Sequence, residues 1–388
     1  MGLQDSVGFV VAILGVALIV SVIAERLGIP YVVALLVVAA PVEIPNLPEH
    51  FAPVLLFVFL PALVFEAAWN VDGRALKRRW LAVTVLALPG VIVTAFLVGG
   101  GLALAKQLPF GPALLLGTIL AATDPVAVIA VFRRLDVPTD LETIVGGESL
   151  FNDGAAIVLY GVVVSLLHGS AQQSIWAVTW SFFAIAAGGA AIGFIVAALV
   201  ARLLRGSIDG PLQVVGTIVA AFGSYLLADR LHLSGIFAAV VAGIAMRAFP
   251  RFPTKEAVAD VDRFWAVLAF LANAIVFVLM GIRIEFVRVL HEPVLVLLTL
   301  AFVTLARVLL GYVVLPLAGA RVAPGWRSVV ALSGMRGAVS IALAIGLPAD
   351  IPMRPMIVDA VFGVVLVTLV AQGLAIGPVI SRLKLAVS

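Results

Sequence analysis

Long apolar stretches alternate with short polar or Pro/Gly-rich breaks along the whole chain. A helix that crosses the hydrocarbon layer of a bilayer needs about 20 mainly apolar residues. By this measure the pattern predicts about thirteen transmembrane helices. The second is short, because only about twelve apolar residues precede Pro41. The expected spans are 7–24, 29–42, 51–69, 80–105, 110–132, 141–167, 175–201, 210–228, 233–250, 263–282, 293–320, 327–347 and 356–380.

The composition points to the same class of protein. Of the 388 residues, 63% are hydrophobic and 12% are charged, whereas soluble domains have about 45–50% and about 25%. With a mean hydropathy of +1.24, this composition excludes a water-soluble fold, a disordered chain and a nucleic-acid-binding protein. The absence of cysteine excludes disulfides and thiolate metal sites. We therefore expect an all-α polytopic membrane protein in which residues 1–388 form a single integral membrane unit with no soluble domain.

The distribution of basic residues predicts an orientation. If the N-terminus lies outside, seventeen of the 24 Lys and Arg residues fall in inside loops and five in outside loops, while Arg307 and Arg336 fall inside spans. This bias follows the positive-inside rule, so we expect the N-terminus outside and the C-terminus in the cytoplasm of a cell-membrane protein. The first span is followed by Glu25 and Arg26 and not by a small-residue cleavage site, so we expect it to be retained.

Two spans carry helix-breaking motifs at comparable positions. Thirteen spans can be divided into six, one and six, and many transporters consist of two inverted repeats, each with an interrupted helix. The span 110–132 contains Thr123-Asp124-Pro125, and the span 327–347 contains Ser-Gly-Met-Arg-Gly at 333–337. Proline removes a backbone donor and glycine permits unwinding. An ordinary kink is the alternative, since Pro or Gly occurs in most of these spans.

Six charged residues fall within the predicted spans. A charge in the hydrocarbon layer is costly, so such residues are by default candidates for function. Four acids against two bases indicate a cation site with internal ion pairs. The six residues are Glu66, Asp124, Glu148, Asp153, Arg307 and Arg336.

The span 141–167 holds the densest polar group. At 3.6 residues per turn, Ser149 and Asp153 share one helix face, and Glu148 and Asn152 share the adjacent face. A hydroxyl and a carboxylate are hard oxygen ligands that suit Na⁺, Li⁺ or H⁺. A hydrogen-bonded contact between helices is the alternative, but it explains a carboxylate in the middle of the membrane less well.

The sequence leaves more than one role possible for two other acids, Asp124 and Glu66. If the helix unwinds at Asp124, freed carbonyls such as that of Thr123 could bind an ion together with the carboxylate. Alternatively, Asp124 could neutralise the exposed N–H ends of a broken helix. Glu66 could be a ligand, a residue of an entrance funnel, or an acid that reaches the membrane surface.

The two arginines within the predicted spans need anionic partners, because arginine does not lose its proton in proteins. Glu148 is a natural partner for either Arg307 or Arg336. Such a pair would be a fixed brace that takes no part in ion exchange.

These motifs resemble those of the cation:proton antiporter superfamily. Within it the chain is similar to the NhaP-like sodium/proton exchangers, the branch that includes the animal sodium/hydrogen exchangers. The resemblance rests on Ala-Thr-Asp-Pro at 122–125, Gly-Glu-Ser-Leu-Phe-Asn-Asp at 147–153 and Gly-Met-Arg-Gly-Ala at 334–338. Patches at 60–66 and 264–281 support it, and the motifs cover nearly the whole chain in family order.

The resemblance implies NhaA-like inverted repeats with two broken, crossed helices, and a homodimer. It implies an ion-carrying part at roughly 80–167 and 293–385 and a dimerisation part at roughly 1–50 and 175–250. The chain departs from the family at the short second span, which lacks the usual glycine-rich end, and we expect no cytoplasmic regulatory tail.

The resemblance also implies an ion site formed by Asp153, Ser149, Thr123 and Asp124, with Glu66 contributing through water. It further implies a brace between Glu148 and an arginine. Relatives that generate voltage carry Asp-Asp where this chain has Asn152 followed by Asp153.

The sequence therefore predicts a secondary antiporter, not an enzyme, that exchanges Na⁺ (or Li⁺) for H⁺ by competition of the two ions for Asp153. Asn152 has no titratable proton, so we expect electroneutral 1:1 exchange. No cofactor is expected, because Na⁺ and H⁺ are the transported substrates. K⁺/H⁺ exchange is the main alternative, since these ligands do not separate Na⁺ from K⁺, and an organic-solute symporter would need a second polar cluster. An intramembrane aspartyl protease fits less well, because the aspartates lie in Thr-Asp-Pro and Asn-Asp-Gly and not in Tyr-Asp and Gly-x-Gly-Asp contexts.

Overall fold

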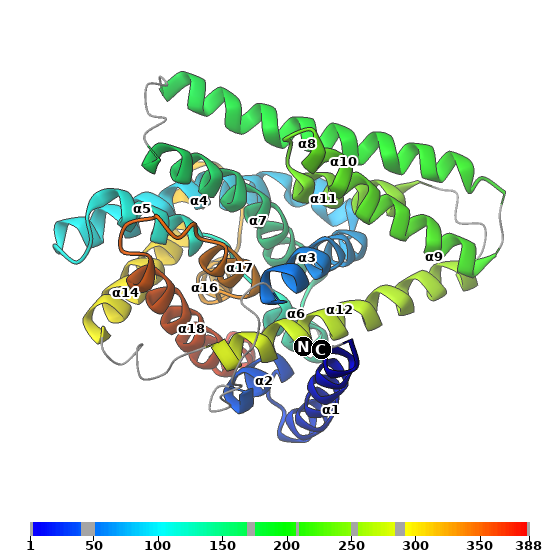
Figure 1. Cartoon of the computed structure of the whole chain (residues 1–388), viewed down its shortest axis with the longest axis horizontal. Helices are drawn as coiled ribbons and strands as arrows, with labels where there is room; N and C mark the ends of the chain where they lie inside the picture. The colour runs from blue at the N-terminus through cyan, green and yellow to red at the C-terminus, as the bar shows by residue number, and fades with distance from the viewer. Residues whose placement is uncertain are drawn as a thin grey trace.

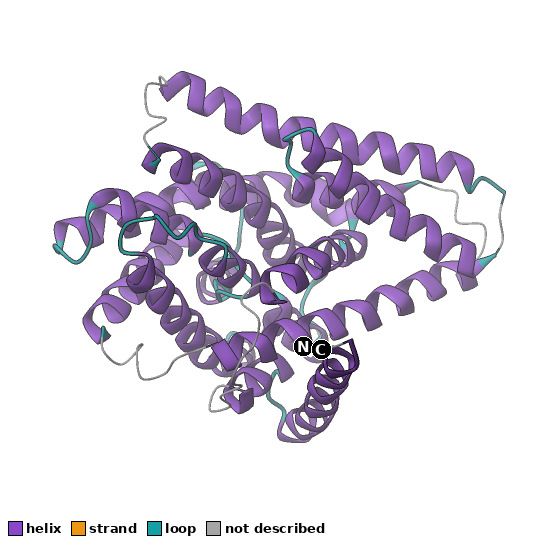
Figure 2. Cartoon of the chain, viewed as in Figure 1, coloured by secondary structure: helices purple, strands orange, loops and turns teal. Residues whose placement is uncertain are grey.

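The computed structural model describes residues 3–39, 51–168, 175–206, 209–249, 255–283 and 292–385. Within these ranges the chain is all-helical and contains no strand (Figure 2). The helices are α1 (Leu3–Leu27), α2 (Tyr31–Ala39), α3 (Phe51–Asn70), α4 (Gly73–Leu104), α5 (Phe110–Ile119), α6 (Val126–Arg134), α7 (Thr139–Leu167), α8 (Ile175–Leu203), α9 (Gly210–Ile218), the π-helix η1 (Val219–Gly223), α10 (Ser224–Arg230), α11 (Gly235–Ala248), α12 (Lys255–Arg283), α14 (Pro293–Leu309), the π-helix η2 (Leu310–Val314), α15 (Leu315–Leu317), α16 (Pro324–Leu332), α17 (Ala338–Ile345) and α18 (Arg354–Arg382).

Each of the thirteen predicted spans corresponds to a helix or to consecutive helices in the described part of the chain. Four spans are composite: α5 with α6, α9 with α10, α14 with α15, and α16 with α17. Eight helical segments of the described residues are long and apolar enough to cross a membrane. The second span is described as α2 up to Ala39, and its predicted end at 40–42 lies outside the described residues.

Two predicted boundaries were wrong because hydropathy does not show where a helix is capped. The sequence placed residues 74–79 in a loop, but α4 begins at Gly73. Asp72 is its N-cap, and Oδ1 of Asp72 accepts from the backbone N–H groups of Arg74 and Ala75, both at 2.8 Å. In the same way α12 begins at Lys255, eight residues before the apolar run predicted to start at 263.

The two motifs with helix breakers interrupt their helices, as predicted. The α5 helix ends at Ile119 and α6 begins at Val126, while α16 ends at Leu332 and α17 begins at Ala338. The two interruptions lie against each other, because the backbone N–H of Asp124 donates to the carbonyl of Met335 at 2.8 Å. The alternative of two ordinary kinks is therefore wrong. In Figure 1, α16 and α17 lie in the interior of the helix bundle.

Buried side chains form two large clusters. One joins α4, α5 and α7 to α14 and α18, and it also includes side chains of α1, α2 and α12. The other joins α3, α8, η1 and α11 to the first half of α12. The long α12 therefore contributes to both clusters along its length.

Glycines allow α8 to approach α11 closely. The long α8 lies along the edge of the bundle beside α11 (Figure 1). A Cβ added at Gly193 would lie only 2.8 Å from the backbone carbon of Ala238, and one at Gly189 would meet the backbone of Ser234. Close backbone approach through small residues is a common way for membrane helices to associate.

This contact predicts the effect of one added methyl group. Gly193→Ala should lower stability by about 1–3 kcal/mol, because the backbone of Ala238 cannot move aside as a flexible side chain would. The measurement is the melting temperature of the purified protein in detergent. Gly100→Ala in α4 is the matched control, since nothing lies within 4 Å of the added Cβ. Equal melting temperatures of the two variants would contradict the close α8–α11 contact.

Candidate ion-binding site

All five residues predicted to bind the ion line one small cavity. Its volume is about 80 Å³, and it lies where α3 and α7 meet the interruption between α5 and α6 and the start of α17. The predicted residues among its lining are Glu66, Thr123, Asp124, Ser149 and Asp153.

Asp153 presents a carboxylate oxygen without a partner. Its Oδ1 atom is shielded from solvent and accepts no hydrogen bond from any described residue. One turn earlier on α7, the hydroxyl of Ser149 donates to the carbonyl of Thr123 at 2.5 Å. Because this bond uses the proton of Ser149, the oxygen of its hydroxyl remains able to act as a ligand.

Asn152 fixes the interrupted segment to α7. Its Nδ2 atom donates to the hydroxyl of Thr123 at 2.8 Å, and its Oδ1 atom accepts from the backbone N–H of Thr123 at 3.3 Å. Nδ2 also lies 3.3 Å from Oε1 of Glu148. Asn152 therefore positions Thr123 beside Ser149 and Asp153, although it does not line the small cavity itself.

Asp124 lies at the N-terminal ends of two broken helices. Its Oδ1 atom accepts from the backbone N–H of Val126 at 2.9 Å, and its carboxylate also accepts from the backbone N–H of Ala338 at the start of α17. Gly337 makes this possible, because any side chain at that position would overlap the carboxylate of Asp124. The carboxylate thus satisfies the N–H groups that the interruptions leave exposed.

Glu148 pairs with Arg307 and not with Arg336. Nη1 and Nη2 of Arg307 donate to the two carboxylate oxygens of Glu148, the second at 3.0 Å, and Nη2 also donates to the carbonyl of Val330 at 2.6 Å. Both side chains are at least 97% buried. The pair therefore joins α7 to α14 and α16 inside the bundle.

Arg336 has a different partner, the carbonyl end of α5. Its Nη1 atom donates to the carbonyls of Ala121 at 2.9 Å and Ala122 at 3.1 Å. Ser340 supports the same region by donating to the carbonyl of Ile119 at 2.9 Å. Positive charge at carbonyl groups complements negative charge at N–H groups, so Arg336 and Asp124 stabilise opposite ends of the interrupted helices.

Glu66 lies between the small cavity and a larger vestibule. On α3, its Oε1 atom accepts from Nδ2 of Asn70 at 2.5 Å. The vestibule has a volume of about 350 Å³ and shares six lining residues with the small cavity, which are Glu66, Ala67, Pro125, Val126, Gly146 and Asn273. The sequence interpretation gave no role to Asn273, although a single buried amide within the apolar part of α12 is a signal that could have marked it.

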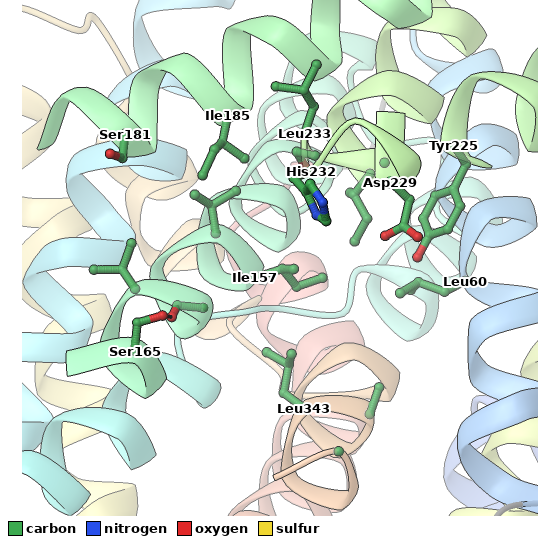
Figure 3. Close-up of a pocket in the computed structure, with 18 of the residues that line it drawn as sticks. Leu60, Ile157, Ser165, Ser181, Ile185, Tyr225, Asp229, His232, Leu233 and Leu343 are labelled. Atoms are coloured by element: carbon green, nitrogen blue, oxygen red, sulfur yellow. Dashed lines mark hydrogen bonds between the residues drawn. The ribbon is translucent and has the colours of Figure 1, made fainter. Parts of the chain in front are cut away.

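A third cavity has a volume of about 820 Å³ (Figure 3). It is lined on α7 by residues that follow Asp153, whereas the vestibule is lined on α7 by residues that precede Ser149. Asp229, Tyr225 and His232 line one part of it, and Leu343 lines another. Leu60 is the single lining residue that it shares with the small cavity, among the described residues. Leu60 packs with Ile157, Val339 and Leu343 in an apolar cluster. The third cavity thus shares one apolar lining residue with the small cavity, whereas the vestibule shares six lining residues with it.

A family model described as "Sodium/hydrogen exchanger, transmembrane" matches residues 12–382. The chain belongs to the sodium/hydrogen exchanger family. It is 36% identical over 393 residues to the Na(+)/H(+) antiporter ApNhaP of Aphanothece halophytica, covering 96% of this chain and 73% of that protein. It is 33% identical to the Na(+)/H(+) antiporter NhaP of Pseudomonas aeruginosa, covering 86% and 82%. The solved structure of the sodium proton antiporter MjNhaP1 from Methanocaldococcus jannaschii has the same fold, with a TM-score of 0.80, 24% identity, and coverage of 100% of this chain and 99% of that one.

Membership of the sodium/hydrogen exchanger family confirms the resemblance found in the sequence. The chain is an integral membrane protein with multiple spans, as a member of a transporter family. It is not an enzyme, so the protease alternative is wrong. Nothing in the family match indicates a cofactor.

The buried pair predicts a stability defect. Glu148→Ala should destabilise the exchanger by about 3–5 kcal/mol, because the charge of Arg307 would be left buried without its partner. The measurement is the melting temperature in detergent, with transport by the same protein as a second readout. Asp140→Asn is the control, because Asp140 also bonds two arginines, Arg78 at 2.6 Å and Arg79 at 2.9 Å. The side chains of Asp140 and Arg78 are 17% and 58% exposed, and a salt bridge that water reaches contributes little. An unchanged melting temperature with lost transport would instead place Glu148 in the ion site.

Proposed function

We propose that this chain is a secondary antiporter that exchanges Na⁺ (or Li⁺) for H⁺ across the membrane. The observation that carries the proposal is the shielded, unpartnered Oδ1 of Asp153 beside Ser149 and Thr123, in a cavity that adjoins a vestibule. The relatives named above as Na(+)/H(+) antiporters support the choice of ions.

The mechanism is competition for one carboxylate. A volume of about 80 Å³ is enough for a cation with one or two water molecules, since a water molecule takes about 30 Å³. The carboxylate of Asp153 and the hydroxyl of Ser149 supply hard oxygen ligands for a dehydrated monovalent cation, and Glu66 contributes through water. A proton on Asp153 removes the charge that holds the cation, so the two ions exclude each other.

Movement of the carrier follows from the same carboxylate. A bare charge in the hydrocarbon layer is costly, so the carrier moves when Asp153 holds either a cation or a proton. The ion-carrying part, at roughly 80–167 and 293–385, would move against a dimerisation part at roughly 1–50 and 175–250. The third cavity and the vestibule, lined by α7 residues after Asp153 and before Ser149, support this alternation. We further propose a homodimer with the N-terminus outside and the C-terminus in the cytoplasm.

Asp153→Ala should abolish exchange and leave a folded protein, and Asp153→Asn should be equally inactive because an amide takes up no proton. The measurement is the pH change inside proteoliposomes when Na⁺, Li⁺ and K⁺ are added in turn. Asp136→Asn is the control, since this exposed residue has φ 48°, a conformation that asparagine also adopts. Exchange near the wild-type rate by Asp153→Asn would exclude the competition mechanism, and a response to K⁺ alone would favour K⁺/H⁺ exchange.

The exchange should be electroneutral, with one Na⁺ for one H⁺. Asp153 is the one residue expected to load and unload, because Asn152 does not titrate and Asp124 is held at two helix ends. Moving a net charge would couple exchange to voltage by about 2.3 kcal/mol per 100 mV. The test clamps liposome voltage with K⁺ and valinomycin and finds the Na⁺ gradient that balances a set pH gradient. A balance point that shifts with voltage would contradict exchange on a single carboxylate.

A further inference from the structure

The vestibule that adjoins the ion site is lined by three acids and one base. The acids are Glu66, Asp72 and Glu142, and the base is Arg133. Among the described residues that line this cavity, Arg133 is the single cation. A cation that passes from the vestibule to Asp153 therefore meets two opposing influences, because the acids attract it and Arg133 repels it.

Arg133 is held in the vestibule by an ion pair. It lies in the last turn of α6, and its Nε atom lies 3.3 Å from Oε1 of Glu142 in the first turn of α7. The side chains are 59% and 29% exposed, so water reaches both groups. The neighbouring Arg134 points elsewhere, since its Nη1 atom donates to the carbonyl of Gly28 at 3.3 Å and it does not line the vestibule.

The pair controls the net charge that a cation meets. While Arg133 and Glu142 are paired, Glu66 and Asp72 determine the field of the vestibule. Asp72 is already engaged as the N-cap of α4, so its carboxylate is partly offset by the N-terminal N–H groups. Removing the charge of Arg133 makes the vestibule more negative by one unit, and removing the charge of Glu142 makes it more positive by one unit. Charged clefts of this kind raise or lower the local concentration of ions.

We propose that Arg133, through its ion pair with Glu142, sets the affinity with which the vestibule supplies Na⁺ to the ion site. This inference rests on the proposed function and names a residue that tunes the affinity of the ion site on one face of the membrane. Arg133 acts through the field and does not touch the ion at Asp153. A single charge in a partly hydrated cavity should change the half-saturating Na⁺ concentration by about threefold.

The experiment measures half-saturating Na⁺ in membrane vesicles whose vestibule face is outward. Arg133→Gln should lower it by about threefold, because the repelling charge is gone. Glu142→Gln should raise it by about threefold, because Arg133 is left without its partner. Arg134→Gln is the matched control and should shift it much less, because Arg134 does not line the vestibule. The double variant Arg133→Glu with Glu142→Arg keeps the pair and the net charge, so it should behave like the wild type.

Salt separates a field effect from a structural one. The differences should shrink when choline chloride is raised from about 10 mM to about 150 mM, because the screening length falls from about 30 Å to about 8 Å. A variant that merely loosens the α6–α7 connection would not respond in this way. Equal half-saturation in Arg133→Gln and the wild type, or shifts of Arg133→Gln and Glu142→Gln in the same direction, would overturn the inference.

A binding measurement keeps this test separate from that of the proposed function. The Na⁺ concentration that half-maximally raises the melting temperature in detergent should shift in the same directions in these variants. If wild-type vesicles exchanged no Na⁺ for H⁺, the proposed function would fail, and the shift of this midpoint would still decide the role of Arg133. An unshifted midpoint in an actively exchanging protein would reject the role of Arg133 alone.

Discussion

The candidate ion site depends on one constraint, which is that backbone N–H and C=O groups in a bilayer have no water to bond. In a bilayer every backbone N–H and C=O must find a partner within the protein, yet two helices here are interrupted between Ile119 and Val126 and between Leu332 and Ala338. Asp124 accepts from N–H groups at the start of α6 and α17, and Arg336 donates to carbonyls beyond the end of α5. These two charged side chains stabilise the interrupted helices by bonding their free backbone groups. The interruption between α5 and α6 in turn brings Thr123 next to α7.

The same bonds distribute the charges inside the bundle. Glu148 is fully engaged by Arg307, Asp124 by two helix ends, and Glu66 by Asn70 at the edge of the vestibule. Asp153 is the acid with a shielded oxygen that no described residue bonds. One oxygen of one carboxylate is thereby left available for a ligand, which favours a single exchangeable ion over a cluster of bound ones.

Local patterns in the sequence were sufficient to predict much of this arrangement. Hydropathy predicted the spans, and the helix breakers around Asp124 and at 334–337 predicted the interruptions, because both features depend on neighbours in the chain. The i, i+4 spacing likewise placed Ser149 beside Asp153. The partner of Glu148 could not be predicted, since Arg307 lies 159 residues away and both arginines were chemically suitable. The vestibule and the place of Arg133 in it could not be predicted either, because this cavity forms where α3, α6, α7 and α12 pack together.

The distribution of the fixed pairs also bears on the energy of transport. Glu148 and Arg307 both lie in the part proposed to carry the ion, and together they have no net charge. Asp124 and Arg336 are likewise one acid and one base within that part, each beside helix ends of the opposite polarity. If these groups move together, their charges cancel, and the net charge that crosses the membrane depends on Asp153 alone. An acid neutralised by either Na⁺ or H⁺ then carries the same charge in both directions, so the internal pairs and the single free carboxylate lead to the same expectation of electroneutral exchange.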